Sequence, residues 1–131
     1  MRLILAITLL FIGVNLVATD TTKVVGSKPK IIYGTASFYA NSFNGKKTAN
    51  GETFSQKKMT AACNVLPLGT WIRVTNLRNG RSVLVRTNDR LHARMKRVVD
   101  LSRSAAEKLN YVKSGLTRVK VEVLGKKKPE E

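Results

Sequence analysis

The feature that most constrains the fold of this chain is a pair of β-branched segments joined by a tight turn signal. Residues 71–76 and 82–88 are both rich in Val, Ile and Thr, which pack well on the pleated surface of a sheet. Asn79-Gly80 lies between them, and both residue types tolerate the positive φ of a tight hairpin turn. We therefore predict an antiparallel hairpin, which commits this part of the chain to a sheet.

The chain after Ile31 repeats this pattern of short segments separated by Gly, Asn and Pro turns. Further strands are expected at residues 32–39, 59–62, 98–100 and 117–124. Residues 101–110 differ, because Ser102 can cap a helix and the alanines and leucine that follow form an apolar stripe at helical spacing. The pattern predicts a mainly β fold, a sandwich or a barrel, with one short helix.

The first 18 residues have the pattern of a Sec signal peptide. Arg2 precedes an apolar run over residues 3–17, which is shorter than the roughly 20 apolar residues of a membrane-spanning helix. Small residues end the run, and cleavage is expected after Ala18. The alternative is an uncleaved anchor, because Leu16-Val17-Ala18 is an imperfect cleavage box. No cysteine lies near this point, so we expect neither a lipobox nor a stable membrane anchor.

The length of 131 residues allows one domain with one hydrophobic core. We assign residues 1–18 to the signal peptide, 19–31 to a polar linker, 32–124 to the folded domain and 125–131 to a disordered charged tail. Cys63 is the only cysteine, so no intrachain disulfide can form. One cysteine and one histidine form no metal-ligand set, and neither a metal nor another cofactor is expected.

The composition is strongly basic, with 24 Lys and Arg against 8 Asp and Glu and a formal charge of +16. Removal of residues 1–18 takes away one charged side chain, Arg2, and leaves +15. Such a charge indicates an anionic partner or environment. For a secreted or periplasmic protein, cell-wall glycan is a more fitting partner than nucleic acid, and no nucleic-acid-binding motif is present. We expect a monomer that binds no nucleic acid.

Two carboxylates stand among turn residues in this acid-poor chain and suggest a chemical role. Glu52 ends the segment Lys-Lys-Thr-Ala-Asn-Gly-Glu, and Asp89 lies in an Asn-Asp-Arg segment at the end of a predicted strand. Without such a role, Asp89 would be a turn or capping residue paired with Arg90. Glu52 would then be an exposed acid paired with Lys46 or Lys47.

Several ordered motifs together resemble one known family. They are GTASFY (34–39), KTANGETF (47–54), TAA (60–62), LPLGT (66–70), VTNL (74–77), NGRSV (79–83), NDR (88–90), VDLS (99–102) and VKVEV (119–123). In order and spacing they resemble the rare lipoprotein A (RlpA) family over about residues 33–124. The resemblance implies a six-stranded double-psi β-barrel, a fold that expansins also use, and an endolytic peptidoglycan lytic transglycosylase activity.

Three departures from the family pattern bear on function. Cys63 stands where the family usually has a histidine, and Leu91-His92 replaces the usual Gly-Pro. The lipidated cysteine and the C-terminal glycan-binding repeat domain of the family are not found in this sequence. The first two departures concern the site, and the third concerns anchoring and targeting.

The implied reaction cleaves the bond between N-acetylmuramic acid (MurNAc) and N-acetylglucosamine (GlcNAc) in denuded glycan strands and leaves 1,6-anhydroMurNAc ends. It needs an acid that protonates the leaving oxygen and then accepts the proton of the C6 hydroxyl. Asp89 is the expected acid and base, and Glu52 is the partner carboxylate, although their roles can be exchanged. Asp100 is also eligible, but Asp-Leu-Ser before a helix is more typical of a capping acid.

Further side chains are expected to contact the substrate. They are Tyr39, Phe43, Cys63, Asn88, Arg90 and His92. Tyr39 and Phe43 could stack on sugar rings, and His92 could partly replace the family histidine. For Cys63, a small buried residue at a strand end is favoured over a nucleophile activated by His92. Arg86, Arg90, Arg94 and Arg97 could hold carboxylates of the substrate, or form a solvated basic face.

The sequence thus predicts a secreted enzyme of cell-wall remodelling whose partner is the peptidoglycan glycan strand. The alternative is a non-catalytic, expansin-like module that binds peptidoglycan without cutting it. Cys63, in the place of the family histidine, is the feature that favours this alternative.

Overall fold

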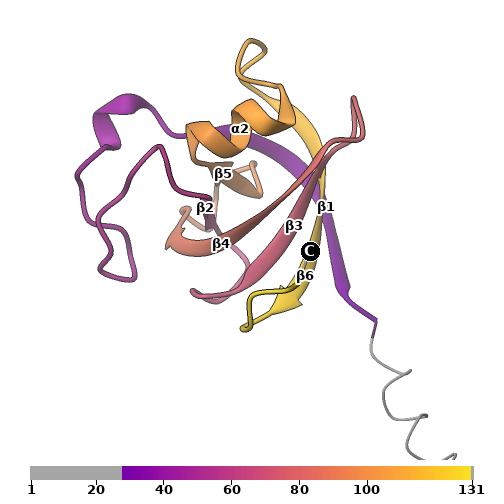
Figure 1. Ribbon diagram of the computed structural model, residues 1–131, viewed down its shortest axis with the longest axis horizontal. Coiled ribbons are helices and arrows are strands. Elements are labelled where there is room, and N and C mark those ends of the chain that lie inside the picture. The colour runs from indigo at the N-terminus through magenta and orange to yellow at the C-terminus, as the bar shows by residue number, and fades with distance from the viewer. Residues whose placement is uncertain (1–27, 131) are drawn as a thin grey trace, which may run out of the picture.

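Within residues 28–130, which the computed structural model describes, six strands close into a barrel in the order β1-β5-β2-β4-β3-β6 (Figure 1). The strands are β1 (Lys30–Phe38), β2 (Thr60–Cys63), β3 (Trp71–Asn76), β4 (Ser82–Arg90), β5 (Val99–Leu101) and β6 (Thr117–Gly125). A 3-10 turn, η1 (Asn41–Phe43), follows β1, and the helix α2 (Arg103–Leu109) follows β5. The predicted mainly β barrel with one short helix is confirmed. The predicted signal peptide and most of the predicted linker lie outside the described residues.

The predicted hairpin is present as β3 and β4, which pair antiparallel from Trp71 opposite Arg86 to Thr75 opposite Ser82. Its turn is longer than the Asn-Gly pair suggested, because residues 77–81 connect the strands, and Gly80 has a φ of 78°. Asn79 acts through its side chain instead. Its amide donates to the carbonyl of Leu109 at 2.9 Å, which ties the hairpin to the end of α2.

Alternating apolar side chains fill the interior of the barrel. Fully buried members come from every wall and from the helix, and include Ala36, Ala61, Ile72, Val74, Val85, Val99, Leu101, Leu109, Val119 and Val121. At about 25 cal/mol for each Å² of apolar surface, burial of this set is the main stabilising contribution to the barrel. The mainly aliphatic core needs no disulfide, and Cys63 is indeed free.

The helix is fixed at both ends by the residues that its sequence predicts. The hydroxyl of Ser102 accepts a hydrogen bond from the backbone N–H of Ala105 at 3.3 Å, which confirms the predicted N-cap. Asn110 ends the helix in the left-handed conformation, with a φ of 59°. Among residues 28–130, no helix has the length and hydropathy that crossing a membrane would require.

A bulge between β2 and β4 shapes the surface on which the polar residues gather. Ala61 pairs with Thr87, but Ala62 pairs with Asp89, so Asn88 is the extra residue on β4. The parallel pairing continues to Arg90, so β4 ends two residues beyond the predicted strand end at Asn88, and Asp89 lies inside the strand rather than after it. The bulge presents Asn88 and Asp89 side by side at the rim of the barrel.

The residues after β6 contact the barrel at two points. The ammonium group of Lys126 donates to the carbonyl of Leu68 at 2.7 Å, and that of Lys128 lies 5.7 Å from the centre of the Trp71 ring. These contacts belong to the segment predicted as a charged tail, and its boundary with the domain stays a prediction.

Candidate active site

A groove of about 460 Å³ lies on the outer face of the barrel where β4, β2, β5 and β1 run side by side. The strand register places Asp89, Ala62, Asp100 and Ser37 in one row across these four strands, and all four line the groove. Ala62 is the smallest of them and leaves room between the two carboxylates. With a strand spacing of about 4.8 Å, the backbone positions of Asp89 and Asp100 are roughly 10 Å apart.

Both carboxylate oxygens of Asp89 accept hydrogen bonds. The hydroxyl of Tyr39 donates to Oδ2 at 2.6 Å, and the backbone N–H groups of Ala49 and Arg90 each donate to Oδ1 at 2.9 Å. These donors come from the end of β1, from the loop before β2 and from β4 itself. The carboxylate is therefore held in one orientation at the wall of the groove.

Tyr39 supports Asp89 through its hydroxyl group, and its ring is largely covered. The ring stacks on Phe54 with centroids 4.1 Å apart, and Phe43 meets it edge-on at 5.5 Å. Burial, and then the hydrogen bond to Asp89, raise the pKa of the Tyr39 phenol well above its usual value. The phenol therefore stays protonated and remains a donor. Phe43 is 45% exposed at the groove, and the Lys46 ammonium lies 5.4 Å from the centre of its ring.

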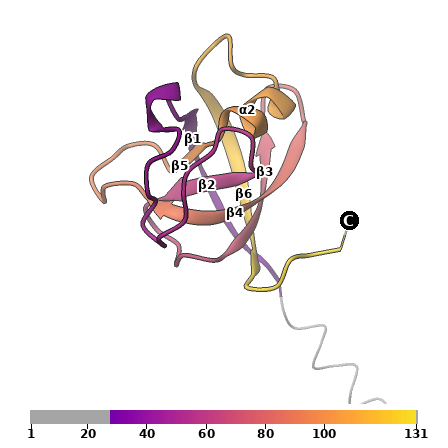
Figure 2. The ribbon, with the colours of Figure 1, turned by 60° about the vertical axis from the view of Figure 1, so that its left-hand side comes forward.

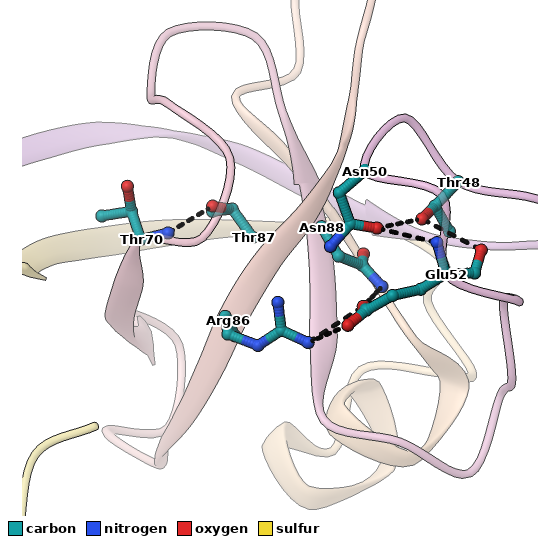
Figure 3. A network of polar contacts seen from close by, with 7 residues as sticks. All are labelled: Thr48, Asn50, Glu52, Thr70, Arg86, Thr87 and Asn88. Carbon is teal, nitrogen blue, oxygen red and sulfur yellow. Dashed lines mark hydrogen bonds and ion pairs between the residues drawn. The ribbon is translucent and has the colours of Figure 1, made fainter. Parts of the chain in front are cut away.

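Glu52 lies in a polar network beside the groove (Figure 3). Arg86 donates to its two carboxylate oxygens at 2.9 and 2.7 Å, and the amide of Asn88 donates at 3.1 Å. The Asn88 bond, followed by the Arg86 bond, lowers the pKa of Glu52, so it is a carboxylate at neutral pH. The ion pair is thus with Arg86, rather than with the neighbouring lysines considered from the sequence.

One loop positions both carboxylates. The segment between η1 and β2 passes the end of β4 (Figure 2), and the backbone N–H of Asn50 donates to the Asn88 carbonyl at 3.2 Å. From this loop Ala49 reaches Asp89, while Glu52 reaches Asn88. The side-chain oxygen of Asn50 accepts from the Thr48 hydroxyl at 2.7 Å and from the Glu52 N–H at 3.1 Å, which fixes the loop internally. The motif KTANGE therefore forms a turn that its own side-chain hydrogen bonds stabilise.

The other predicted contact residues divide into two groups. Arg90 and His92 line the groove with Tyr39 and Phe43, and both are exposed. The Nδ1 atom of His92 accepts a hydrogen bond from the backbone N–H of Arg94 at 3.1 Å. Arg90 has no side-chain hydrogen bond within residues 28–130.

Cys63 and Asn88 are buried outside the groove lining. Cys63 is 2% exposed, and strand alternation turns it away from the face of Ala62. Among the described residues no hydrogen bond joins Cys63 to His92, so the nucleophile pair is not formed. The Asn88 side-chain oxygen is buried without a hydrogen-bond partner in residues 28–130, while its amide binds Glu52.

Asp100 is held by partners that spacing alone did not reveal. Arg97 donates to its two oxygens from Nε at 2.8 Å and from Nη2 at 3.1 Å, and the Ser37 hydroxyl donates at 2.6 Å. Ser102, not Asp100, caps the helix. Ser37 was missed from the sequence, although it lies two residues before Tyr39 and alternation puts both on one face. Within the described part of the chain no cluster of side chains is suited to a metal ion.

Comparison with known proteins connects this geometry to a family. The family model described as lytic transglycolase matches residues 31–121. The endolytic peptidoglycan transglycosylase RlpA of Pseudomonas aeruginosa (strain UCBPP-PA14) is 56% identical over 89 residues, which are 68% of this chain and 26% of that protein. The probable endolytic peptidoglycan transglycosylase RlpA of Nostoc sp. (strain PCC 7120) is 46% identical over 114 residues, 86% of this chain and 31% of that protein. The chain spans about a quarter to a third of these relatives.

Two solved structures share the fold. An apo expansin of Clavibacter michiganensis superposes with a TM-score of 0.60 at 19% identity. The superposition covers 78% of this chain and 53% of the expansin chain. The Streptomyces papain inhibitor gives a TM-score of 0.60 at 19% identity, with 72% and 94% covered. These identities show the fold alone, and they agree with the predicted double-psi β-barrel. Because the family model spans nearly the whole barrel, the chain belongs to the lytic transglycolase family, in agreement with its resemblance to the rare lipoprotein A proteins.

Proposed function

We propose that this protein is an endolytic peptidoglycan lytic transglycosylase that cleaves MurNAc–GlcNAc bonds of glycan strands and leaves 1,6-anhydroMurNAc ends. The observation that carries the proposal is Asp89, a carboxylate oriented at both oxygens on the wall of an open groove. The printed names of the relatives, endolytic peptidoglycan transglycosylase, support the substrate and the reaction.

Asp89 acts as both acid and base in this proposal. Its protonated carboxyl gives a proton to the glycosidic oxygen as the bond from the muramic C1 to that oxygen breaks. The resulting Asp89 carboxylate then takes the proton of the C6 hydroxyl as O6 bonds to C1. The residue ends in the form in which it began, and no water is consumed. The Tyr39 phenol remains a donor throughout, since its raised pKa keeps it protonated.

Glu52 takes the part of the permanent carboxylate. Its lowered pKa makes it a poor proton donor at neutral pH, so in this proposal it acts through its ion pair with Arg86 and its hydrogen bond from Asn88, beside Asp89. Phe43, whose ring is partly exposed at the groove, offers a surface on which a sugar ring can pack.

The test is to incubate the exported protein with denuded strands and to measure anhydromuramic ends by mass spectrometry. Asp89→Asn should lower the rate by about 10² to 10⁴-fold, because the proton transfer is lost. Glu52→Gln should cost up to about 10²-fold, because the ion pair with Arg86 is lost while the shape of the side chain is kept. Glu107→Gln is the matched control, since Glu107 is an exposed acid on α2 away from the groove, and its rate should not change.

The outcomes separate the rival activities. Binding without anhydro ends would leave the expansin-like module as the function, and reducing ends would indicate a hydrolase. Rates unaltered in both acid variants would mean that other groups carry the chemistry.

We further propose that this reaction takes place outside the cytoplasm, in a secreted or periplasmic monomer. The support is the signal-peptide pattern of residues 1–18 and the basic charge, which suits an anionic wall polymer.

A further inference from the structure

An arginine is fixed in place at the far end of the groove from Asp89. Arg97 makes a two-pronged contact with Asp100, through Nε to one oxygen at 2.8 Å and Nη2 to the other at 3.1 Å. The Ser37 hydroxyl donates at 2.6 Å to Oδ1 of Asp100, the same oxygen that accepts from Arg97 Nε. All three residues line the groove, and the side chains of Arg97 and Asp100 are 31% and 15% exposed. The pair is thus partly desolvated and geometrically defined.

The guanidinium of Arg97 has capacity to spare. It carries five N–H donors, and only two of them are used by protein acceptors within residues 28–130. Asp100 raises the pKa of Arg97, so the side chain stays charged. Because the side chain is already ordered, a ligand that binds it does not bear the entropy cost of fixing a free arginine.

The other arginines near the groove differ from Arg97 in one respect or another. Arg86 is paired with Glu52 and is not among the groove-lining residues. Arg90 lines the groove but is exposed and unsupported by any side-chain partner in the described region. Arg94 is exposed and does not line the groove. Arg97 alone among these four combines a place in the groove with a fixed orientation.

We propose that Arg97 binds a carboxylate of the peptidoglycan strand and that Asp100 and Ser37 are its positioning residues. This inference rests on the proposed substrate and names the group that the groove recognises. Planar, two-pronged recognition of a carboxylate is the contact that a guanidinium makes best. Arg90, the other cation in the groove, offsets the negative charge of Asp89 and Asp100 that a carboxylate would meet.

Two carboxylate sources in peptidoglycan share this chemistry. In a denuded strand the lactyl group of each muramic acid ends in a free carboxylate. In a peptide-bearing strand that carboxyl is tied up in an amide, and the free carboxylates belong to the peptide. The separation of roughly 10 Å between the Asp89 and Asp100 positions is on the scale of a disaccharide, which suits a carboxylate on the same sugar chain that Asp89 attacks.

Binding measurements test this proposal without depending on cleavage. The protein carrying Asp89→Asn, in which turnover is blocked, is titrated calorimetrically with three strands at about 0.15 M salt. The strands are denuded, denuded with the lactyl carboxylates converted to amides, and peptide-bearing. We expect denuded strands to bind about tenfold more tightly than the amidated ones, as one charge-assisted contact would give. Adding Arg97→Gln should abolish this ratio, and Arg97→Lys, which keeps the charge without the fork, should reduce it.

The matched control is Arg94→Gln, which removes the same charge from the same loop and should leave the ratio unchanged. Equal losses on all three strands in Arg97→Gln would overturn the proposal, as would an equal effect of Arg94→Gln. If Arg97→Gln weakens the binding of peptide-bearing strands most, the carboxylate that Arg97 binds belongs to the peptide. Failure of the wild-type protein to form anhydro ends would refute the proposed reaction and leave these binding ratios interpretable.

Discussion

At the scale of single residues, Tyr39 lies at the candidate site as predicted, but its hydroxyl group, rather than its ring, makes the contact that matters there. An aromatic side chain near the Glu52 loop suggested a ring that stacks on sugars. The ring is covered by Phe54, however, and its hydroxyl holds Asp89. A sequence shows that an aromatic is present, but the covering of its faces depends on a contact between residues 39 and 54 that only the fold makes.

Tyr39→Phe isolates the hydroxyl, because the ring and its packing on Phe54 are retained. Hydrogen bonds to charged groups contribute about 1.5–3 kcal/mol, so a freed Asp89 carboxylate should lower kcat by roughly 10 to 100-fold. KM for denuded strands should change little, since the phenol is not a proposed sugar contact. Steady-state release of anhydro products measures both constants.

Tyr111→Phe provides the comparison for that variant. Tyr111 is a second buried tyrosine, and its hydroxyl donates to the Ser37 carbonyl at 2.8 Å. Tyr111→Phe should lower the free energy of unfolding by about 1 kcal/mol, as Tyr39→Phe should, with no large change in kcat. Parallel losses of rate in the two variants would show that stability, not the orientation of Asp89, governs the effect of Tyr39→Phe.

Cys63 marks a different limit of reading residues one at a time. Its place in the motif aligned it with a polar family residue, and we therefore placed it among the substrate contacts. Its strand partners, Arg90 and Val99, and its 2% exposure leave it outside the groove lining. Whether a side chain at a strand end points into the barrel or out of it depends on the register with the neighbouring strands. This register cannot be derived from one sequence.

At the scale of elements, local pattern was sufficient for the strands and the helix, and insufficient for their irregularities. Alternation and turn residues predicted each strand of the barrel within a few residues of its observed bounds. The bulge at Asn88 was not predicted, because it is defined by the pairing of β2 with β4, which are distant in sequence. That bulge brings Asn88 and Asp89 to one rim of the barrel. The candidate site is therefore harder to predict from the sequence than the fold.

The contact between β1 and the start of β5 gives an element-scale prediction. A Cβ added to Gly34 would lie 2.7 Å from Cγ1 and 2.9 Å from Cβ of Val98, closer than real carbon contacts. Gly34→Ala should therefore destabilise the barrel by about 1–3 kcal/mol, as overpacked cores do. Urea unfolding monitored by the fluorescence of Trp71 measures the loss.

A double-mutant cycle with Val98→Gly separates this steric cause from a general strand effect. Val98→Gly makes room for the added methyl, so the double variant should lose less free energy of unfolding than the sum of the single changes. Strict additivity would contradict the close approach of these strands. The approach matters for the site, because the same pairing aligns Ser37 with Asp100.

At the scale of the whole molecule, the dominant property is a charge of +16, or +15 once residues 1–18 are removed. This net charge is large because only 8 acids offset 24 Lys and Arg side chains. A field of this kind raises the rate of encounter with an anionic strand, and salt screens it over a Debye length of about 8 Å at 0.15 M. The interactions in the groove act over short distances. Asp89 accepts a hydrogen bond from Tyr39, and Asp100 is paired with Arg97.

Salt should therefore separate encounter from chemistry. Between about 0.05 and 0.5 M NaCl, kcat/KM on denuded strands should fall by tenfold or more, because long-range attraction is screened. The value of kcat at saturating substrate should change less than about twofold, because the contacts around Asp89 are short and partly buried. Binding of uncharged chitin oligosaccharides should be nearly independent of salt and serves as the control. An equal loss of kcat would place the salt-sensitive charges in the catalytic step itself, and a flat kcat/KM would mean that the basic surface has another partner.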